Sequence, residues 1–342
     1  MLRYIIIILG ALCIGFTVQG QGWINVPDFP EELGNINWNR NYEEAISMAK
    51  SEDKPVFILF QEVPGCVTCR NYGNNLLTHP LIVETIETYF IPLAIYNNKG
   101  GSDAEILKKF DEPSWNNPVS RIINPNSEKD IVKRLNGRYD MSNLVAFISN
   151  GIIESGNIVP EYLNLLYQEV SSIDLREIHL SMFCFWSGEK ILGELHGVVS
   201  TNAGFMNGTE VVKVKYDANR VTEEKLISYA SKQRCADAVY TNDKREEKAA
   251  QKYNIKTESE GKFRADGEPK YYIYKSQYRY LPMTKLQALK VNTSISKHTS
   301  PERFLSPRQL ELLQLIKEGE ISKRNVIDQD FSDSWHKILG SK

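Results

Sequence analysis

Two cysteines, Cys66 and Cys69, carry the clearest chemical signal in the chain because they follow a buried strand at a predicted helix start. The apolar run at residues 55–60 ends in Pro64-Gly65, and the two thiols lie three positions apart. The unpaired N–H groups and positive dipole end of a helix start favour a thiolate. We therefore predict a redox-active disulfide in which Cys66 is the exposed nucleophile and Cys69 attacks the mixed disulfide.

Two other interpretations of this cysteine pair are half of a zinc site and two buried apolar side chains. Zinc would require a second pair of Cys or His residues at short spacing, whereas the nearest histidine is His79 alone. The strand followed by a helix favours redox chemistry. We expect no metal and no cofactor.

Composition is that of an ordinary soluble globular protein, with 42% apolar and 25% charged residues. A length of 342 residues is enough for two domains. The formal net charge of -2 gives no reason to expect a nucleic acid or an anionic membrane surface as a partner.

The first 20 residues have the pattern of a secretory signal, with Arg3 before an apolar run from Tyr4 to Val18. We therefore expect an exported protein, periplasmic or secreted, with an uncleaved anchor as the alternative. If Cys13 leaves with the signal, four cysteines remain. An even number fits an oxidising compartment, and four are too few for a structural disulfide framework in a chain of this size.

Residues 36–150 resemble the thioredoxin family in the order of their predicted elements. Trp38 and a helix precede the strand, the Cys-x-x-Cys helix follows it, and a Pro-Val strand begins at Pro118. The resemblance implies an α/β thioredoxin-like domain in which Pro118 is cis and lies against the two cysteines. Residues 63–69, with the pattern Val-Pro-Gly-Cys-x-Thr-Cys, also resemble a bacterial thioredoxin-like group that accepts selenocysteine at the first position. That likeness implies that Cys66 is the attacking residue.

A second reactive thiol is predicted at Cys184, which precedes Phe185 and Trp186 at another helix start. A return strand and a strand that begins with the acidic Glu210 follow. The alternative is a buried, inert cysteine with two packing aromatic side chains.

Residues 177–295 resemble the methionine sulfoxide reductase A family, which implies an α+β domain of the ferredoxin-like kind. The matching blocks are Cys184-Phe185-Trp186, Gly197-Val198, Gly204-Phe205, Glu210-Val211-Val212 and Tyr216-Asp217.

The resemblance also implies a mechanism. The Cys184 thiolate attacks the sulfoxide sulfur of oxidised methionine, Phe185 and Trp186 hold the methyl group, and Glu210 donates a proton to the leaving oxygen. Glu210 as a solvated charge at a strand end is the alternative. The sulfenic acid formed on Cys184 is condensed to a disulfide by a second thiol, and Cys235 is the candidate because it is the other cysteine in this half.

The sequence departs from the family's pattern after the Gly204-Phe205 match. Residues 206–209 replace the longer family loop that carries Asn-Pro-Thr-Tyr, so one catalytic tyrosine of the family has no counterpart. The family's Gln-Tyr-Arg motif matches Gln277-Tyr278-Arg279, which makes Tyr278 a candidate catalytic tyrosine. Another alignment places Ser276 at the tyrosine position instead. A carboxy-terminal helical tail is predicted at residues 297–342.

These features predict an exported peptide-methionine (S)-S-oxide reductase whose thioredoxin-like domain recycles it. Its partners would be methionine sulfoxide in oxidised proteins or peptides and an external thiol electron donor. The second hypothesis is a thiol-disulfide oxidoreductase that works through Cys66 and Cys69, with a non-catalytic second domain. A non-catalytic binding module is the third.

Overall fold

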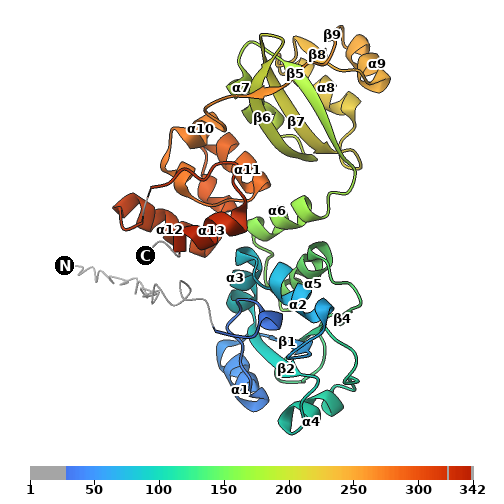
Figure 1. The fold of residues 1–342 in the computed structure, drawn as a ribbon, viewed down its shortest axis with the longest axis vertical. Helices are drawn as coiled ribbons and strands as arrows, with labels where there is room; N and C mark the ends of the chain where they lie inside the picture. Colours follow the sequence, from blue (N-terminus) through green and yellow to red (C-terminus); the bar gives the residue numbers. More distant parts are fainter. Residues whose placement is uncertain (1–27, 322, 340–342) are drawn as a thin grey trace, which may run out of the picture.

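The computed structural model describes residues 28–321 and 323–339. Two β-sheets with their own helices form this part of the chain, and a group of helices lies between them (Figure 1). The predicted signal at residues 1–20, with Cys13, lies outside the described residues, so export stays a prediction. No helix within the described ranges has the length and apolar character needed to span a membrane.

The first sheet has the strand order β2-β1-β3-β4. β2 is parallel to β1, whereas β3 is antiparallel to β1 and β4 is antiparallel to β3. The central strand β1 is buried along its whole length, which explains its continuous run of apolar residues. The strands are β1 (Val56–Gln61), β2 (Ile91–Tyr96), β3 (Val119–Ile123) and β4 (Leu135–Asn136).

Helices cover both faces of this sheet because side chains alternate along β1. Ile58 and Phe60 pack with α1 and α4 in one apolar cluster, and Phe57 and Leu59 pack with α2, α3 and α5 in another. The short helix η2 (Glu31–Leu33) lies against α2. The bounds are α1 (Tyr42–Glu52), α2 (Val67–Asn75), α3 (Pro80–Tyr89), α4 (Ser102–Lys109) and α5 (Met141–Glu154).

The second sheet has the strand order β10-β6-β7-β5-β8-β9. Its pairs are antiparallel except β8 with β9, which is parallel. The three long strands β5, β6 and β7 form its centre. The bounds are β5 (Leu175–Ser181), β6 (Val198–Met206), β7 (Thr209–Asp217), β8 (Ala238–Tyr240), β9 (Lys256–Glu258) and β10 (Arg264–Ala265).

Helices of the second domain pack on this sheet and on one another. α7 contacts β6, β7 and α8, while α11 contacts β6, α7 and α10. α9 packs on α8 beside β8 and β9. The bounds are α7 (Phe185–Leu192), α8 (Glu223–Lys232), α9 (Lys244–Lys252), α10 (Tyr271–Tyr274), η3 (Gln277–Tyr280) and α11 (Lys285–Ser296).

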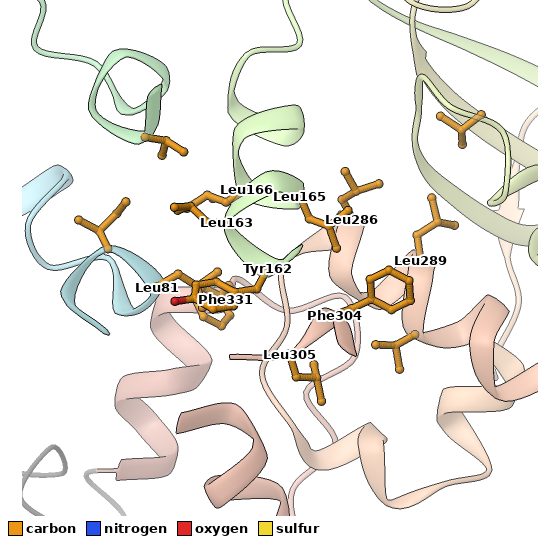
Figure 2. Packing of buried hydrophobic residues seen from close by; sticks show 14 of the residues in the cluster. Leu81, Tyr162, Leu163, Leu165, Leu166, Leu286, Leu289, Phe304, Leu305 and Phe331 are labelled. Carbon is orange, nitrogen blue, oxygen red and sulfur yellow. The ribbon is translucent and has the colours of Figure 1, made fainter. Parts of the chain in front are cut away.

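The junction between the sheets is a continuous apolar core with α6 (Glu161–Val170) at its centre. Figure 2 shows side chains of α6 between Leu81 of α3 on one side and Leu286 and Leu289 of α11 on the other. The C-terminal helices, which lie within the predicted segment 297–342, contribute to this core (Figure 1). They are η4 (Pro301–Phe304), α12 (Pro307–Glu318) and α13 (Phe331–Leu339).

Charged groups attach the C-terminal helices to the first domain. Glu84 of α3 accepts a hydrogen bond of 2.8 Å from the backbone N–H of Arg308 at the start of α12. The Arg308 guanidinium also forms an ion pair with Glu87. A carboxylate at a helix N-terminus satisfies an otherwise unpaired N–H group and complements the helix dipole.

His79 lies at the contact between α3 and α13. Its ring centroid is 5.3 Å from that of Phe331, and its Nδ1 has no hydrogen-bond partner among the described residues. Burial lowers the pKa of His79 to about 4 from an ordinary value of 6.5. The imidazole is therefore neutral in the folded protein at neutral pH.

This burial predicts acid-sensitive stability. Below pH 6.5 the unfolded chain protonates His79, whereas the folded chain stays neutral there until about pH 4, so stability falls as the pH falls through this window. Between pH 7 and pH 4 we expect a His79→Phe variant to lose about 3 kcal/mol less unfolding free energy than the wild type. Urea unfolding at both pH values measures the difference. The exposed His298→Asn control should follow the wild type, and identical pH dependence in all three proteins would contradict the assignment.

Candidate functional site

The first cysteine pair lies directly after the buried strand β1. Cys66 is the N-cap residue of α2 and is exposed, whereas Cys69 lies in its first turn and is buried. Their Sγ atoms are 3.6 Å apart. Gly65 permits this close packing, since a Cβ atom there would lie 2.4 Å from the carbonyl oxygen of Glu62 and 2.6 Å from Cys69 Cβ.

The two thiols differ in acidity. A hydrogen bond from the backbone N–H of Cys69 lowers the pKa of Cys66. Burial raises the pKa of Cys69 to about 11. The accessible sulfur is therefore the more easily ionised one, which suits Cys66 for attack and Cys69 for resolution.

The loop before β3 lies against the buried thiol. Cys69 Sγ donates a hydrogen bond of 2.8 Å to Asn117 Oδ1, and the peptide bond between Asn117 and Pro118 is cis. This places the segment of Pro118 beside the pair, as the resemblance implied. A second cis bond, which the sequence analysis did not anticipate, joins Val63 to Pro64.

Cys184 occupies the same position in the second domain, as the N-cap residue of the helix α7 that follows β5. Its own side chain does not cap the helix. Instead, Glu210 Oε2 accepts a hydrogen bond of 2.9 Å from the backbone N–H of Phe185. The structure therefore brings Cys184 and the carboxylate of Glu210 to one helix start.

Aromatic side chains gather beside Cys184. Phe185 is buried and packs edge-on to Phe205, with ring centroids 5.3 Å apart. Trp186 stacks on Tyr271 with centroids 4.0 Å apart and an interplanar angle of 19°. The predicted pair of aromatic residues is thus part of a larger apolar group.

Two residues of this site, Asp266 and Tyr271, were not among the residues predicted from the sequence. Asp266 Oδ2 accepts a hydrogen bond of 3.0 Å from Trp186 Nε1, and Tyr271 stacks on the same indole. The aromatic run at residues 271–274 was the available signal. The hydroxyl of the predicted Tyr278 instead donates a hydrogen bond to Glu302 in η4.

A buried ion pair ties the Tyr271 segment to α7. Lys270 Nζ lies 2.9 Å from Glu189 Oε1, with 2% and 0% of the two side chains exposed. Lys270 also donates a hydrogen bond to the backbone carbonyl of Thr201 in β6. Separating the two groups would leave an uncompensated buried charge, so this contact holds the segment that carries Tyr271.

The predicted resolving residue Cys235 is buried, and burial raises the pKa of its thiol to about 12. Cys235 Sγ donates a hydrogen bond of 3.4 Å to the carbonyl oxygen of Ala230. Cys184 follows the end of β5 and Cys235 precedes the start of β8, where Ser181 pairs with Ala238. Both cysteines thus flank the same end of paired strands, although each is a free thiol in this structure.

Comparison with known proteins finds two kinds of similarity. A family model described as thioredoxin-like matches residues 37–125. Two curated proteins that match part of the chain are named peptide methionine sulfoxide reductase MsrA. The one from Lachnoclostridium phytofermentans is 33% identical over 69 residues, which cover 15% of this chain and 42% of that protein. The one from Methanococcus maripaludis is 35% identical over 63 residues, which cover 14% of this chain and 40% of that protein.

The chain joins a thioredoxin-like domain to a methionine sulfoxide reductase A-like domain. The predicted fold classes of both domains are confirmed. The chain spans less than half the length of the two curated relatives named above.

Solved structures of both kinds are also similar to parts of the chain. Methionine sulfoxide reductase A of Corynebacterium diphtheriae has a TM-score of 0.24 at 22% identity, over 28% of this chain and 71% of that one. A thioredoxin from Thermus thermophilus has a TM-score of 0.31 at 18% identity, over 35% of this chain and 90% of that one. The oxidoreductase DsbH has a TM-score of 0.31 at 14% identity, over 38% of this chain and 93% of that one.

The acidity difference predicts the order in which thiols react. In the reduced protein at pH 7, iodoacetamide should alkylate Cys66 before Cys69, because the first thiol is exposed with a lowered pKa and the second is buried with a pKa of about 11. Cys235 should stay unmodified while the protein is folded. Mass spectrometry of tryptic peptides measures the order. As a control, the three thiols should be alkylated at similar rates in urea, where the protein is unfolded. Faster alkylation of Cys69 than of Cys66 in the folded protein would contradict the assigned roles.

Proposed function

We propose that the protein is an exported thiol redox enzyme that reduces methionine (S)-sulfoxide and is recycled by its own thioredoxin-like domain. The observation that carries the proposal is the group at the start of α7. There Cys184 precedes the helix, Glu210 binds its first N–H group, and Trp186 stacks on Tyr271. The similarity to proteins named peptide methionine sulfoxide reductase supports the same chemistry.

The reaction at Cys184 transfers the sulfoxide oxygen to the thiol. The Cys184 thiolate attacks the sulfoxide sulfur, and Glu210 donates a proton to the oxygen. Methionine is released in its reduced form, and Cys184 becomes a sulfenic acid. The aromatic side chains of Phe185 and Trp186 provide an apolar surface for the substrate methyl group.

Tyr271 compensates for the tyrosine loop that residues 206–209 replace. Its ring covers Trp186, and the Lys270–Glu189 ion pair holds the neighbouring backbone. A phenol at this place can donate a hydrogen bond to the sulfoxide oxygen. The proposed site therefore relies on the carboxyl group of Glu210 and the hydroxyl group of Tyr271.

Recycling requires two further thiol steps. The Cys235 thiol condenses with the sulfenic acid of Cys184, which releases water and forms a disulfide. The Cys66 thiolate then attacks that disulfide, and Cys69 resolves the mixed disulfide to leave a Cys66–Cys69 disulfide. Covalent linkage of the two domains raises the effective concentration of the reducing pair. An external thiol donor restores the oxidised pair.

The second candidate function is thiol-disulfide exchange at Cys66 and Cys69 with a non-catalytic second domain. The lowered pKa of the exposed Cys66 thiol beside a buried partner favours it. So does the burial of Cys235, which must become accessible before it can resolve the sulfenic acid.

Steady-state assays with dithiothreitol separate these functions. A Cys184→Ser variant should lose reduction of a methionine (S)-sulfoxide peptide, whereas Cys66→Ser should keep it because dithiothreitol replaces the first domain. With a thiol donor that reduces only the Cys66–Cys69 pair, both variants should be inactive. Full activity of Cys184→Ser would exclude the proposed site, and activity in no sample would favour the second candidate.

A Glu210→Gln substitution tests the proton donor. The glutamine oxygen can still accept the hydrogen bond from the Phe185 N–H, so the helix start is kept while the acid is lost. We expect kcat to fall about 100-fold or more, with little change in thermal stability. Glu177→Gln on β5 is the matched control and should retain wild-type kcat. An unchanged kcat in Glu210→Gln would assign this carboxylate to capping alone.

A further inference from the structure

A third potential ligand lies beside the cysteine pair of the first domain. A carboxylate oxygen of Glu62 and the Sγ atoms of Cys66 and Cys69 all lie within 4.8 Å of one another. Glu62 directly follows β1, so the same strand end that delivers the thiols also delivers the carboxylate. In the sequence analysis zinc was set aside because no second pair of Cys or His residues is near. A carboxylate is an alternative zinc ligand.

The sulfur positions fit a tetrahedral metal. Two thiolates bound to Zn²⁺ at about 2.3 Å with tetrahedral angles lie about 3.8 Å apart. The Sγ atoms of Cys66 and Cys69 are 3.6 Å apart in the reduced pair. Coordination therefore requires only a small adjustment of the two side chains.

The Glu62 carboxylate is free to complete such a site. Arg70 and Lys54, the two basic residues nearest to Glu62 along the chain, both contact other groups. Arg70 donates a hydrogen bond of 2.7 Å to the Gly65 carbonyl oxygen and lies 3.4 Å from Glu31. Lys54 lies 2.9 Å from Glu52. Among the described residues, no hydrogen bond or ion pair holds the Glu62 side chain in another place. A rotation of this side chain toward the sulfurs thus breaks no ionic contact.

We propose that the reduced protein binds one Zn²⁺ ion through Cys66, Cys69 and Glu62, with water as the fourth ligand. Binding replaces the two thiol protons, which are released to solvent, and changes no oxidation state. The same sulfurs form the disulfide, so the metal and the disulfide exclude each other. Zn²⁺ then blocks disulfide exchange at this pair and protects it from oxidation.

Binding is tested on the reduced protein in a Cys184→Ser/Cys235→Ser background, where the pair supplies the only thiols of the described chain. Competition with a chromogenic chelator measures the affinity for Zn²⁺, and the ultraviolet thiolate-to-metal band with Cd²⁺ counts bound sulfurs. We expect one ion per chain and two thiolates. Cys69→Ser should abolish binding, and prior oxidation of the pair should do the same.

Glu62→Gln tests the carboxylate. It should weaken Zn²⁺ binding at least about tenfold, since removal of even an outer partner of a metal ligand costs that much. Glu31→Gln, a neighbouring exposed carboxylate that faces Arg70, is the matched control and should bind as tightly as the parent. Equal affinity in Glu62→Gln, or no stoichiometric binding to the reduced parent, would overturn the proposal. The assay uses no sulfoxide, so its failure leaves the proposed reductase function untouched.

Discussion

The placement of a thiol at the start of a helix is the constraint on which both candidate sites depend. Cys66 precedes α2 after the buried strand β1, and Cys184 precedes α7 after β5. In each case the sheet fixes the strand, and the helix start offers N–H groups that stabilise negative charge. In the first domain the charge falls on the sulfur of Cys66. In the second, the Phe185 N–H donates a hydrogen bond to the carboxyl group of Glu210 beside Cys184, the group that we propose as the proton donor.

The shared apolar core gives these two sites a fixed frame. α6 packs against α3 on one side and α11 on the other (Figure 2). The helix α12 receives a carboxylate from α3 at its N-terminus. The domains are therefore connected by more than a linker, and the electron transfer that we propose between the two cysteine sites has to be compatible with this packing.

Local features of both sites could be predicted from the sequence because they depend on neighbouring residues. The strand before Cys66, the helix that begins near Asn41, and the helix start at Cys184 follow from apolar patterns, turn residues and helix signals. The predicted cis bond at Pro118 came from the family resemblance, and the structure has it.

Features that depend on distant contacts were not predictable in this way. Trp186 donates a hydrogen bond to Asp266, which is 80 positions away in the sequence. No local sequence pattern specifies that partner. Glu62 is close to Cys66 and Cys69 in the sequence, but its spacing from them matches no recognisable metal-binding motif. Tyr271, which was not predicted, stacks on Trp186 of α7, whereas the predicted Tyr278 donates a hydrogen bond to Glu302.

The most direct test of the account is a single turnover without any reductant. A reduced Cys235→Ser/Cys66→Ser variant is mixed with a methionine (S)-sulfoxide peptide and dimedone, and the methionine formed is compared with dimedone adducts located by mass spectrometry. The account predicts about one methionine per chain and one adduct on Cys184. No methionine, or methionine without an adduct on Cys184, would contradict it.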